Sequence, residues 1–194
     1  LTFARINEAS KTWQGKLVPV RQEMEQQIAQ RAGAPYAARK VAFQLPDFID
    51  IVLNAGDSRS ATGATIGQSL PNWGKVSEAG GRTVVMTNLY TDPDSAATLQ
   101  SLASSVFCPA TMKGFTTAPA AGLMTTVLHE ASHNLGPAHD YKVGGKTDDA
   151  IFGGPLASML EEFKAQTLGM YYAEWLVTKG LISADDAHAS HIRD

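Results

Sequence analysis

Residues 123–136 read LMTTVLHEASHNLG, and within them His129, Glu130 and His133 form an HExxH motif. Four apolar residues flank the motif and can pack a helix into a core: Leu123, Met124, Val127 and Leu128. The pattern therefore predicts a helix over residues 118–135 whose two histidines face a cleft. Because positions i and i+4 lie on nearly one face of an α-helix, both imidazoles can bind one metal ion. Glu130 can then act as the general base that takes a proton from a water on that ion.

A catalytic zinc site needs three protein ligands and an open position, and one candidate for the third ligand is His139. Residues 129–139, HEASHNLGPAH, extend the motif to HExxHxxGxxH, in which a glycine turns the chain so that the last histidine returns to the metal. Met159 and Met170 are the available residues for a downstream methionine turn, but both stand in a predicted helix. Pro137 also restricts the bend after the glycine.

The other candidate for the third ligand is a carboxylate from the helix predicted over residues 155–179. Glu161 and Glu162 stand there side by side among apolar residues. Acidic groups on a partly buried helix are costly unless they are paired or bound to a metal. From the residues alone, a histidine and a carboxylate both remain open as the third ligand.

Composition excludes several classes of protein. The 194 residues are 44% hydrophobic, enough for one core, and contain no apolar run near the length of a membrane span. The 16 basic and 19 acidic residues give a net charge of −3 without basic blocks, which argues against a nucleic-acid partner. A single cysteine, Cys108, excludes an internal disulfide and a zinc cluster of thiolates. We expect a soluble protein, with the compartment open between the cytoplasm and, after processing, the periplasm or the exterior.

The remaining patterns predict an α+β fold that is predominantly α-helical, with the zinc site between two successive helices and a few short strands. Further helices are predicted over residues 3–31, with an interruption near Pro19, over residues 96–107 and over residues 183–191. Extended segments are predicted within 41–53 and 83–90, and a long connection over 54–82. The segment Asp92-Pro93-Asp94-Ser95 is expected to cap the helix that follows it, and Ser183 is the expected N-terminal cap of the last helix.

Two segments resemble the dipeptidyl-peptidase III family of zinc metallopeptidases. EEFKAQTLGMYY, residues 161–172, looks like the family's EE-x-(R/K)-A-(E/D) signature with its glycine and aromatic continuation. Residues 66–88 are similar to a family segment with a Pro-Asn turn, a glycine and a strand that ends in Asn. The resemblance spans roughly residues 54–180. The best-known members carry HExxxH, one residue longer than the motif of this chain.

The resemblance implies a set of roles at the matching positions. His129, His133 and Glu162 would be the zinc ligands, and Glu130 the general base. Glu161 would orient one of the histidines from outside the ligand set, as metal-bound imidazoles commonly require.

The expected function is zinc-dependent hydrolysis of a peptide or protein substrate. The alternatives are a metzincin-like protease with His139 as the third ligand and a non-catalytic binding module stabilised by zinc. We expect residues 1–194 to form a single catalytic domain of a larger protein whose other lobes contribute to substrate binding. His188 and His191 are candidates, by position only, for a histidine that stabilises the transition state.

Overall fold

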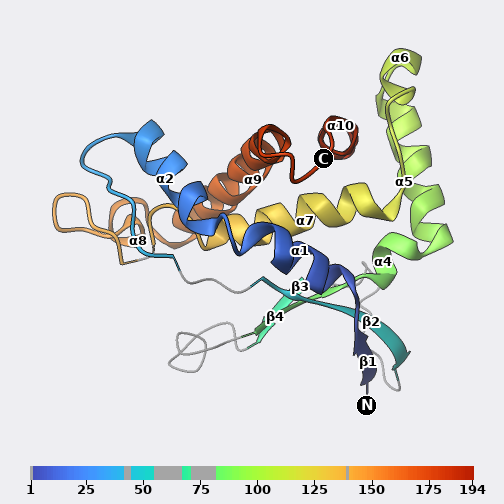
Figure 1. The fold of residues 1–194 in the computed structure, drawn as a ribbon, viewed down its shortest axis with the longest axis horizontal. Coiled ribbons are helices and arrows are strands. Elements are labelled where there is room, and N and C mark those ends of the chain that lie inside the picture. The colour runs from blue at the N-terminus through green and yellow to red at the C-terminus, as the bar shows by residue number, and fades with distance from the viewer. Residues whose placement is uncertain (1, 42–44, 55–66, 71–81, 139) are drawn as a thin grey trace.

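A computed structural model describes residues 2–41, 45–54, 67–70, 82–138 and 140–194. The described chain is mainly helical, with a small sheet on one side of a layer of helices (Figure 1). Its elements, in chain order, are β1 (Thr2–Ile6), α1 (Ala9–Leu17), α2 (Arg21–Ala32), β2 (Asp47–Asn54), β3 (Gly67–Leu70), β4 (Arg82–Met86), α4 (Asn88–Thr91), α5 (Pro93–Val106), α6 (Pro109–Met112), α7 (Pro119–His133), α8 (Asp148–Phe152), α9 (Gly154–Thr178) and α10 (Ala184–Arg193). The fold is therefore of the α+β class and predominantly α-helical, as predicted.

The four described strands form one sheet in the order β1-β2-β4-β3. β2 pairs with β4 in parallel, and the outer strands β1 and β3 pair antiparallel to their neighbours. Phe48 of β2 and Val85 of β4 are fully buried, so the central strands contribute to the core. Asp50 of β2 accepts hydrogen bonds from Thr87, which follows β4, and from Asn7, which follows β1. These hydrogen bonds lower the pKa of the Asp50 carboxyl.

The helical layer is centred on α7 and α9, which pack along each other with α10 beside both (Figure 1). Val127 and Leu128 of α7 are buried against the same core as Tyr172 and Leu176 of α9. The hydroxyl of Tyr172 donates a hydrogen bond of 2.6 Å to the carbonyl of Met24, so α2 is fixed to α9. This arrangement places the HExxH residues and the two adjacent glutamates on neighbouring helices.

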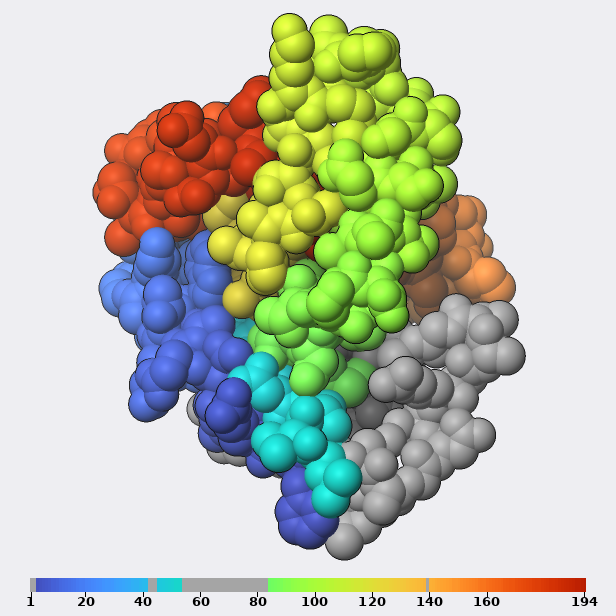
Figure 2. Space-filling model, turned by 90° about the vertical axis from the view of Figure 1, so that its right-hand side faces the viewer, coloured from blue at the N-terminus to red at the C-terminus, as the bar shows by residue number. Residues whose placement is uncertain are grey.

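α5 and α6 form an arm that extends away from the helical layer. Figure 2 shows α5 in green running up this face of the molecule, with the red α10 to one side. Asp92, the first residue of the predicted capping segment, caps α5 by accepting a hydrogen bond of 2.8 Å from the backbone N–H of Ser95. Leu102, Val106 and Phe107 of this arm are exposed.

The predicted long helices are confirmed. α7 covers most of the range 118–135, and α9 covers 155–179 almost to the residue. Ser183 caps α10, with its hydroxyl accepting from the backbone N–H of Asp186 at 3.0 Å. The break near Pro19 is also observed, because α1 ends at Leu17 and α2 begins at Arg21.

Two sequence predictions need correction. The predicted helix from residue 3 is wrong at its start, because residues 2–6 form β1 and pair with β2. The predicted strand over 83–90 ends at Met86, and Asn88–Thr91 form the short helix α4. The predicted connection over 54–82 contains β3, and its residues 55–66 and 71–81 lie outside the described chain. None of the described helices is both long enough and apolar enough to cross a membrane.

Candidate metal centre

Two helices carry the candidate site. α7 bears His129, Glu130 and His133 in its last two turns, and α9 bears Glu161 and Glu162 in its second and third turns. The short helix α8 lies between α7 and α9 in the sequence. The backbones of α7 and α9 approach closely at one point, because a Cβ atom at Gly169 would lie 3.3 Å from the backbone nitrogen of His129. The absence of a side chain at Gly169 thus allows α9 to bring its acidic residues to the histidines.

Three electron-pair donors converge between the helices. The Nε2 atoms of His129 and His133 are 3.1 Å apart. The Oε2 atom of Glu162 lies 3.2 Å from Nε2 of His129 and 3.6 Å from Nε2 of His133. In a tetrahedral zinc site with bonds near 2.0–2.2 Å, neighbouring ligand atoms are about 3.3 Å apart. The triangle therefore has the size and the donor chemistry that zinc requires.

The imidazole of His133 is oriented by Glu161. Nδ1 of His133 lies 2.9 Å from Oε1 of Glu161, whose other oxygen is 2.9 Å from Nζ of Lys164. Since a carboxylate only accepts, Nδ1 carries a proton, and in the neutral imidazole Nε2 is left with a lone pair. Burial favours a high pKa for Glu161, but the hydrogen bonds from His133 and Lys164 outweigh it and lower the pKa. The hydrogen bond with Glu161 is the main cause that raises the pKa of His133.

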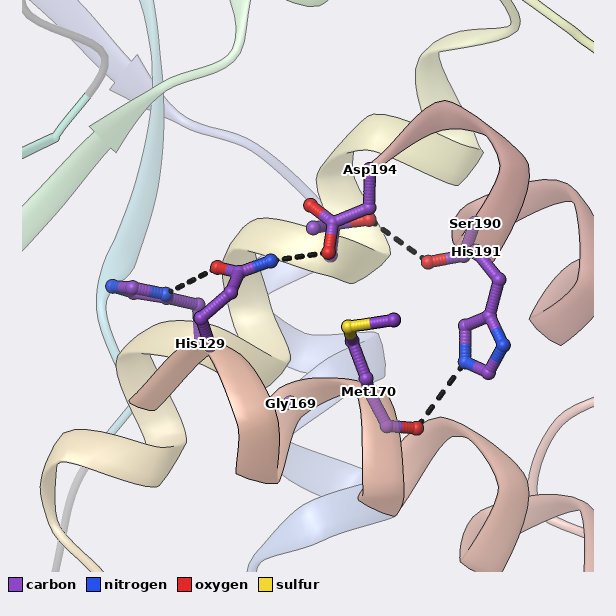
Figure 3. Close-up of a pocket in the computed structure, with 8 residues that line it drawn as sticks. His129, Gly169, Met170, Ser190, His191 and Asp194 are labelled. Atoms are coloured by element: carbon purple, nitrogen blue, oxygen red, sulfur yellow. Dashed lines mark hydrogen bonds between the residues drawn. The ribbon is translucent and has the colours of Figure 1, made fainter. Parts of the chain in front are cut away.

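The imidazole of His129 is oriented by a different residue, Gln166. Nδ1 of His129 donates to Oε1 of Gln166 at 2.9 Å, and the amide nitrogen of Gln166 donates to Oδ2 of Asp194 (Figure 3). Gln166 stands one helical turn after Glu162, on the same face of α9. Both histidines thus have their Nδ1 protons engaged and their Nε2 lone pairs facing Glu162. Lone pairs that face one another at these distances repel unless a cation lies among them.

Glu130 is half-buried on α7, where it follows His129 in the sequence. Its charge adds to that of Glu161 and Glu162 among the causes that raise the pKa of His133, after the hydrogen bond with Glu161. No hydrogen bond joins the Glu130 carboxylate to any residue that the structure describes; the backbone carbonyl of Glu130 accepts from Asn134 at 3.1 Å. Its carboxylate is therefore available to a substrate or a water beside the donor triangle.

The structure places the two adjacent glutamates differently. The side chain of Glu162 is 65% exposed and places its Oε2 atom in the donor triangle. The side chain of Glu161 is 17% exposed and contacts Nδ1 of His133, the ring nitrogen outside the triangle. His139, the competing third ligand, lies outside the described residues. His191 contacts α9 instead of the triangle, with Nε2 3.2 Å from the carbonyl of Met170. Gln166 was not singled out from the sequence, although its spacing from Glu162 is the signal that could have found it.

A buried carboxylate, that of Glu25, holds the chain that leaves α7. Glu25 of α2 is fully buried and accepts from the backbone N–H of Gly136 at 2.8 Å, from that of Arg39 at 3.2 Å and from the hydroxyl of Tyr36. Arg39 donates in turn to the carbonyls of Gly136, at 2.9 Å, and Asn134, at 2.7 Å. Gly136 has a φ of +73°, in the left-handed region that favours glycine. The hydrogen bonds of Glu25 and Arg39 thus fix the backbone immediately after His133.

The described chain has the fold of part of the dipeptidyl-peptidase III structures. The structure of that protein from Caldithrix abyssi matches with a TM-score of 0.78 and 23% sequence identity, over 99% of this chain and 36% of the other. The structure from Corallococcus sp. strain EGB matches with a TM-score of 0.72 and 21% identity, over 99% of this chain and 35% of the other. This chain thus spans about a third of the length of these structures. The sequence matches no protein-family model and no curated protein.

Proposed function

We propose that the protein is a zinc-dependent peptidase with His129, His133 and Glu162 as metal ligands and Glu130 as general base. The observation that carries this proposal is the triangle of three donor atoms 3.1–3.6 Å apart, in which both histidines have their Nδ1 atoms held by acceptors. Such a triangle leaves a fourth tetrahedral position open, as catalytic zinc sites do. The peptide as substrate class rests on the likeness of the fold to the dipeptidyl-peptidase III structures.

A zinc ion bound there would polarise a carbonyl group and lower the pKa of water to about 7. The residues of the chain would transfer the protons and orient the metal ligands. Glu130 would take the proton as the water oxygen bonds to the peptide carbonyl carbon. The same carboxyl would return a proton to the amide nitrogen as the C–N bond breaks and the amine leaves. Glu161 and Gln166 would keep both imidazoles in the orientation that exposes Nε2.

Substitution of the general base tests this mechanism. Glu130→Gln keeps the size of the side chain but removes its basicity, so we expect zinc to remain bound and hydrolysis to fall by about 10²-fold or more. Glu8→Gln is the matched control, because its carboxylate is exposed and pairs only with Lys11 among the described residues. Zinc content and cleavage of a peptide library, with and without a chelator, are the measurements. Retained hydrolysis in Glu130→Gln would disprove the mechanism.

The two alternatives give different results in the same assays. For a non-catalytic module, zinc raises the unfolding temperature but no peptide in the library is cleaved. If His139 is the third ligand, His139→Ala loses zinc while Glu162→Ala keeps it. The single catalytic domain over residues 1–194, and its place in a larger protein with further lobes, are part of the same proposal. Activity of residues 1–194 on peptides would show that no further lobe is needed for hydrolysis.

A further inference from the structure

The hydrogen bond between His129 and Gln166 depends on which way the amide group of Gln166 is turned, a condition that a carboxylate in its place would not have. A carboxylate accepts from Nδ1 of an imidazole through either oxygen, as Glu161 does for His133. An amide presents a carbonyl oxygen in one orientation and an NH₂ group in the other. If the NH₂ group of Gln166 faced Nδ1, the proton of His129 would move to Nε2, and the nitrogen that faces Glu162 would lose its lone pair.

Asp194 removes this ambiguity. Its Oδ2 accepts a hydrogen bond from the amide nitrogen of Gln166, and the amide oxygen then faces Nδ1 of His129 at 2.9 Å (Figure 3). Because an ionised carboxylate has no proton to donate, only one orientation of the amide satisfies both neighbours. We propose that Asp194 is a positioning residue that fixes the orientation of the Gln166 amide and, through it, the tautomer of His129 that can bind a metal.

The packing of α10 holds Asp194 in this place. The hydroxyl of Ser190 on α10 lies 2.8 Å from that of Thr125 on α7, one turn before His129. His191 bonds to the carbonyl of Met170 on α9, so α10 is attached to both helices of the site (Figure 3). These residues and Gly169 line a small hollow between the three helices. The hydrogen-bonded residues His129, Gln166 and Asp194 form part of the same lining. The helix α10 therefore contributes to the metal centre without supplying a ligand.

This inference rests on the proposed metal-binding role of His129, and its test begins on the metal-free protein. The tautomer of His129 is read from the ¹⁵N shifts of its imidazole, with the His129→Ala variant used for assignment. We expect a protonated Nδ1 in the native chain and a mixture of tautomers in Asp194→Ala. Asp185→Ala is the matched control, since this exposed aspartate lies in the first turn of the same helix and makes no hydrogen bond to Gln166. An unchanged tautomer in Asp194→Ala would overturn the proposal.

A double-mutant cycle provides the second readout, zinc affinity measured by competition with a chelator. Asp194→Ala alone should weaken zinc binding by about 10-fold, the lower end of what loss of an orienting partner costs. In a Gln166→Glu background, Asp194→Ala should have the opposite effect on zinc affinity. The new carboxylate needs no orientation and is repelled by Asp194, so Asp194→Ala should there strengthen binding. A loss of affinity in both backgrounds would mean that Asp194 acts only on stability and would overturn the proposal. Absence of zinc binding in the native chain would refute the proposed function, and the tautomer measurement would still decide the inference.

Discussion

Glu25 and Glu162 are carboxylates near the same stretch of α7, but their surroundings are opposite. Glu25 is fully buried and accepts from three donors, two backbone N–H groups and a tyrosine hydroxyl. Glu162 is 65% exposed, and its oxygen faces two imidazole nitrogens that hold lone pairs. A carboxylate surrounded by donors is already satisfied and serves the fold. A carboxylate surrounded by acceptors needs a cation, which marks a binding site. Removing each carboxylate in turn tests the contrast.

The largest expected effect is on metal binding in Glu162→Ala. Because Glu162 is a proposed direct ligand, its loss should weaken zinc affinity by more than about 100-fold, beyond the usual cost of losing an orienting partner. The unfolding free energy of the metal-free protein should change by less than about 0.5 kcal/mol, because the side chain is mostly exposed. Chelator competition and chemical denaturation measure the two quantities. Full zinc affinity in this variant would remove Glu162 from the ligand set.

Glu25→Ala should show the reverse pattern. It leaves the buried N–H group of Gly136 and the other donors without their acceptor, so the unfolding free energy should fall by about 2–3 kcal/mol. Zinc affinity of the folded protein should fall by less than in Glu162→Ala, since Glu25 touches no candidate ligand. Glu8→Ala is a control for loss of an exposed carboxylate. Equal losses of affinity in Glu25→Ala and Glu162→Ala would refute the contrast.

Glu161 stands between the two cases, because it is mostly buried yet bonded to a proposed ligand. Glu161→Gln retains an oxygen that accepts from Nδ1 of His133 but loses the charge. We expect zinc affinity to fall by about 10-fold, less than for the proposed ligand Glu162. A drop as large as that of Glu162→Ala would instead identify Glu161 as a ligand.

The smallest expected effect is the pH dependence of the metal-free protein. The pKa of His133 is raised, so its contribution to stability is present below its ordinary pKa of 6.5 and is lost as the pH rises through the raised value. The pKa of Glu161 is lowered, so its contribution is present above 4.5 and is lost as the pH falls through the lowered value. Native protein and Glu161→Gln should therefore differ most between pH 4.5 and 6.5, by at most about 1 kcal/mol. Denaturation in EDTA at several pH values measures this, and a constant difference from pH 4 to 9 would contradict it.

The same two glutamates show what could be read from the sequence. Glu162 could be named as a candidate ligand because HExxH and a pair of acids in an apolar helix are local patterns, and the resemblance to the dipeptidyl-peptidase III family favoured the second acid of the pair. Glu25 was not found, because it is 11 residues from Tyr36, 14 from Arg39 and 111 from Gly136, and no local pattern joins these positions. Only the tertiary fold brings them together.

The secondary structure shows the same difference between elements with local sequence signals and elements that depend on distant contacts. The long helices α7 and α9 carry their own signals in apolar spacing and were predicted almost to their ends. β1 was predicted as helix, because its extended form depends on pairing with β2, whose residues follow much later in the chain, as in Ile6 with Ile49. Asp194 could not be predicted as a neighbour of Gln166 for the same reason, since the packing of α10 on α9 sets that contact.

The placement of all three proposed ligands on two touching helices has a consequence for chain entropy. A metal ion held by His133 and Glu162 would tie together points 29 residues apart (162 − 133) and would restrict the unfolded chain as a cross-link does. The intervening segment contains the exposed turn at Gly144 and Gly145, both with positive φ. Doubling the length of such a loop costs only about 0.6 kcal/mol in closure entropy. Insertions at this turn should therefore leave the donor triangle intact, so this segment can change in length without loss of the proposed metal centre.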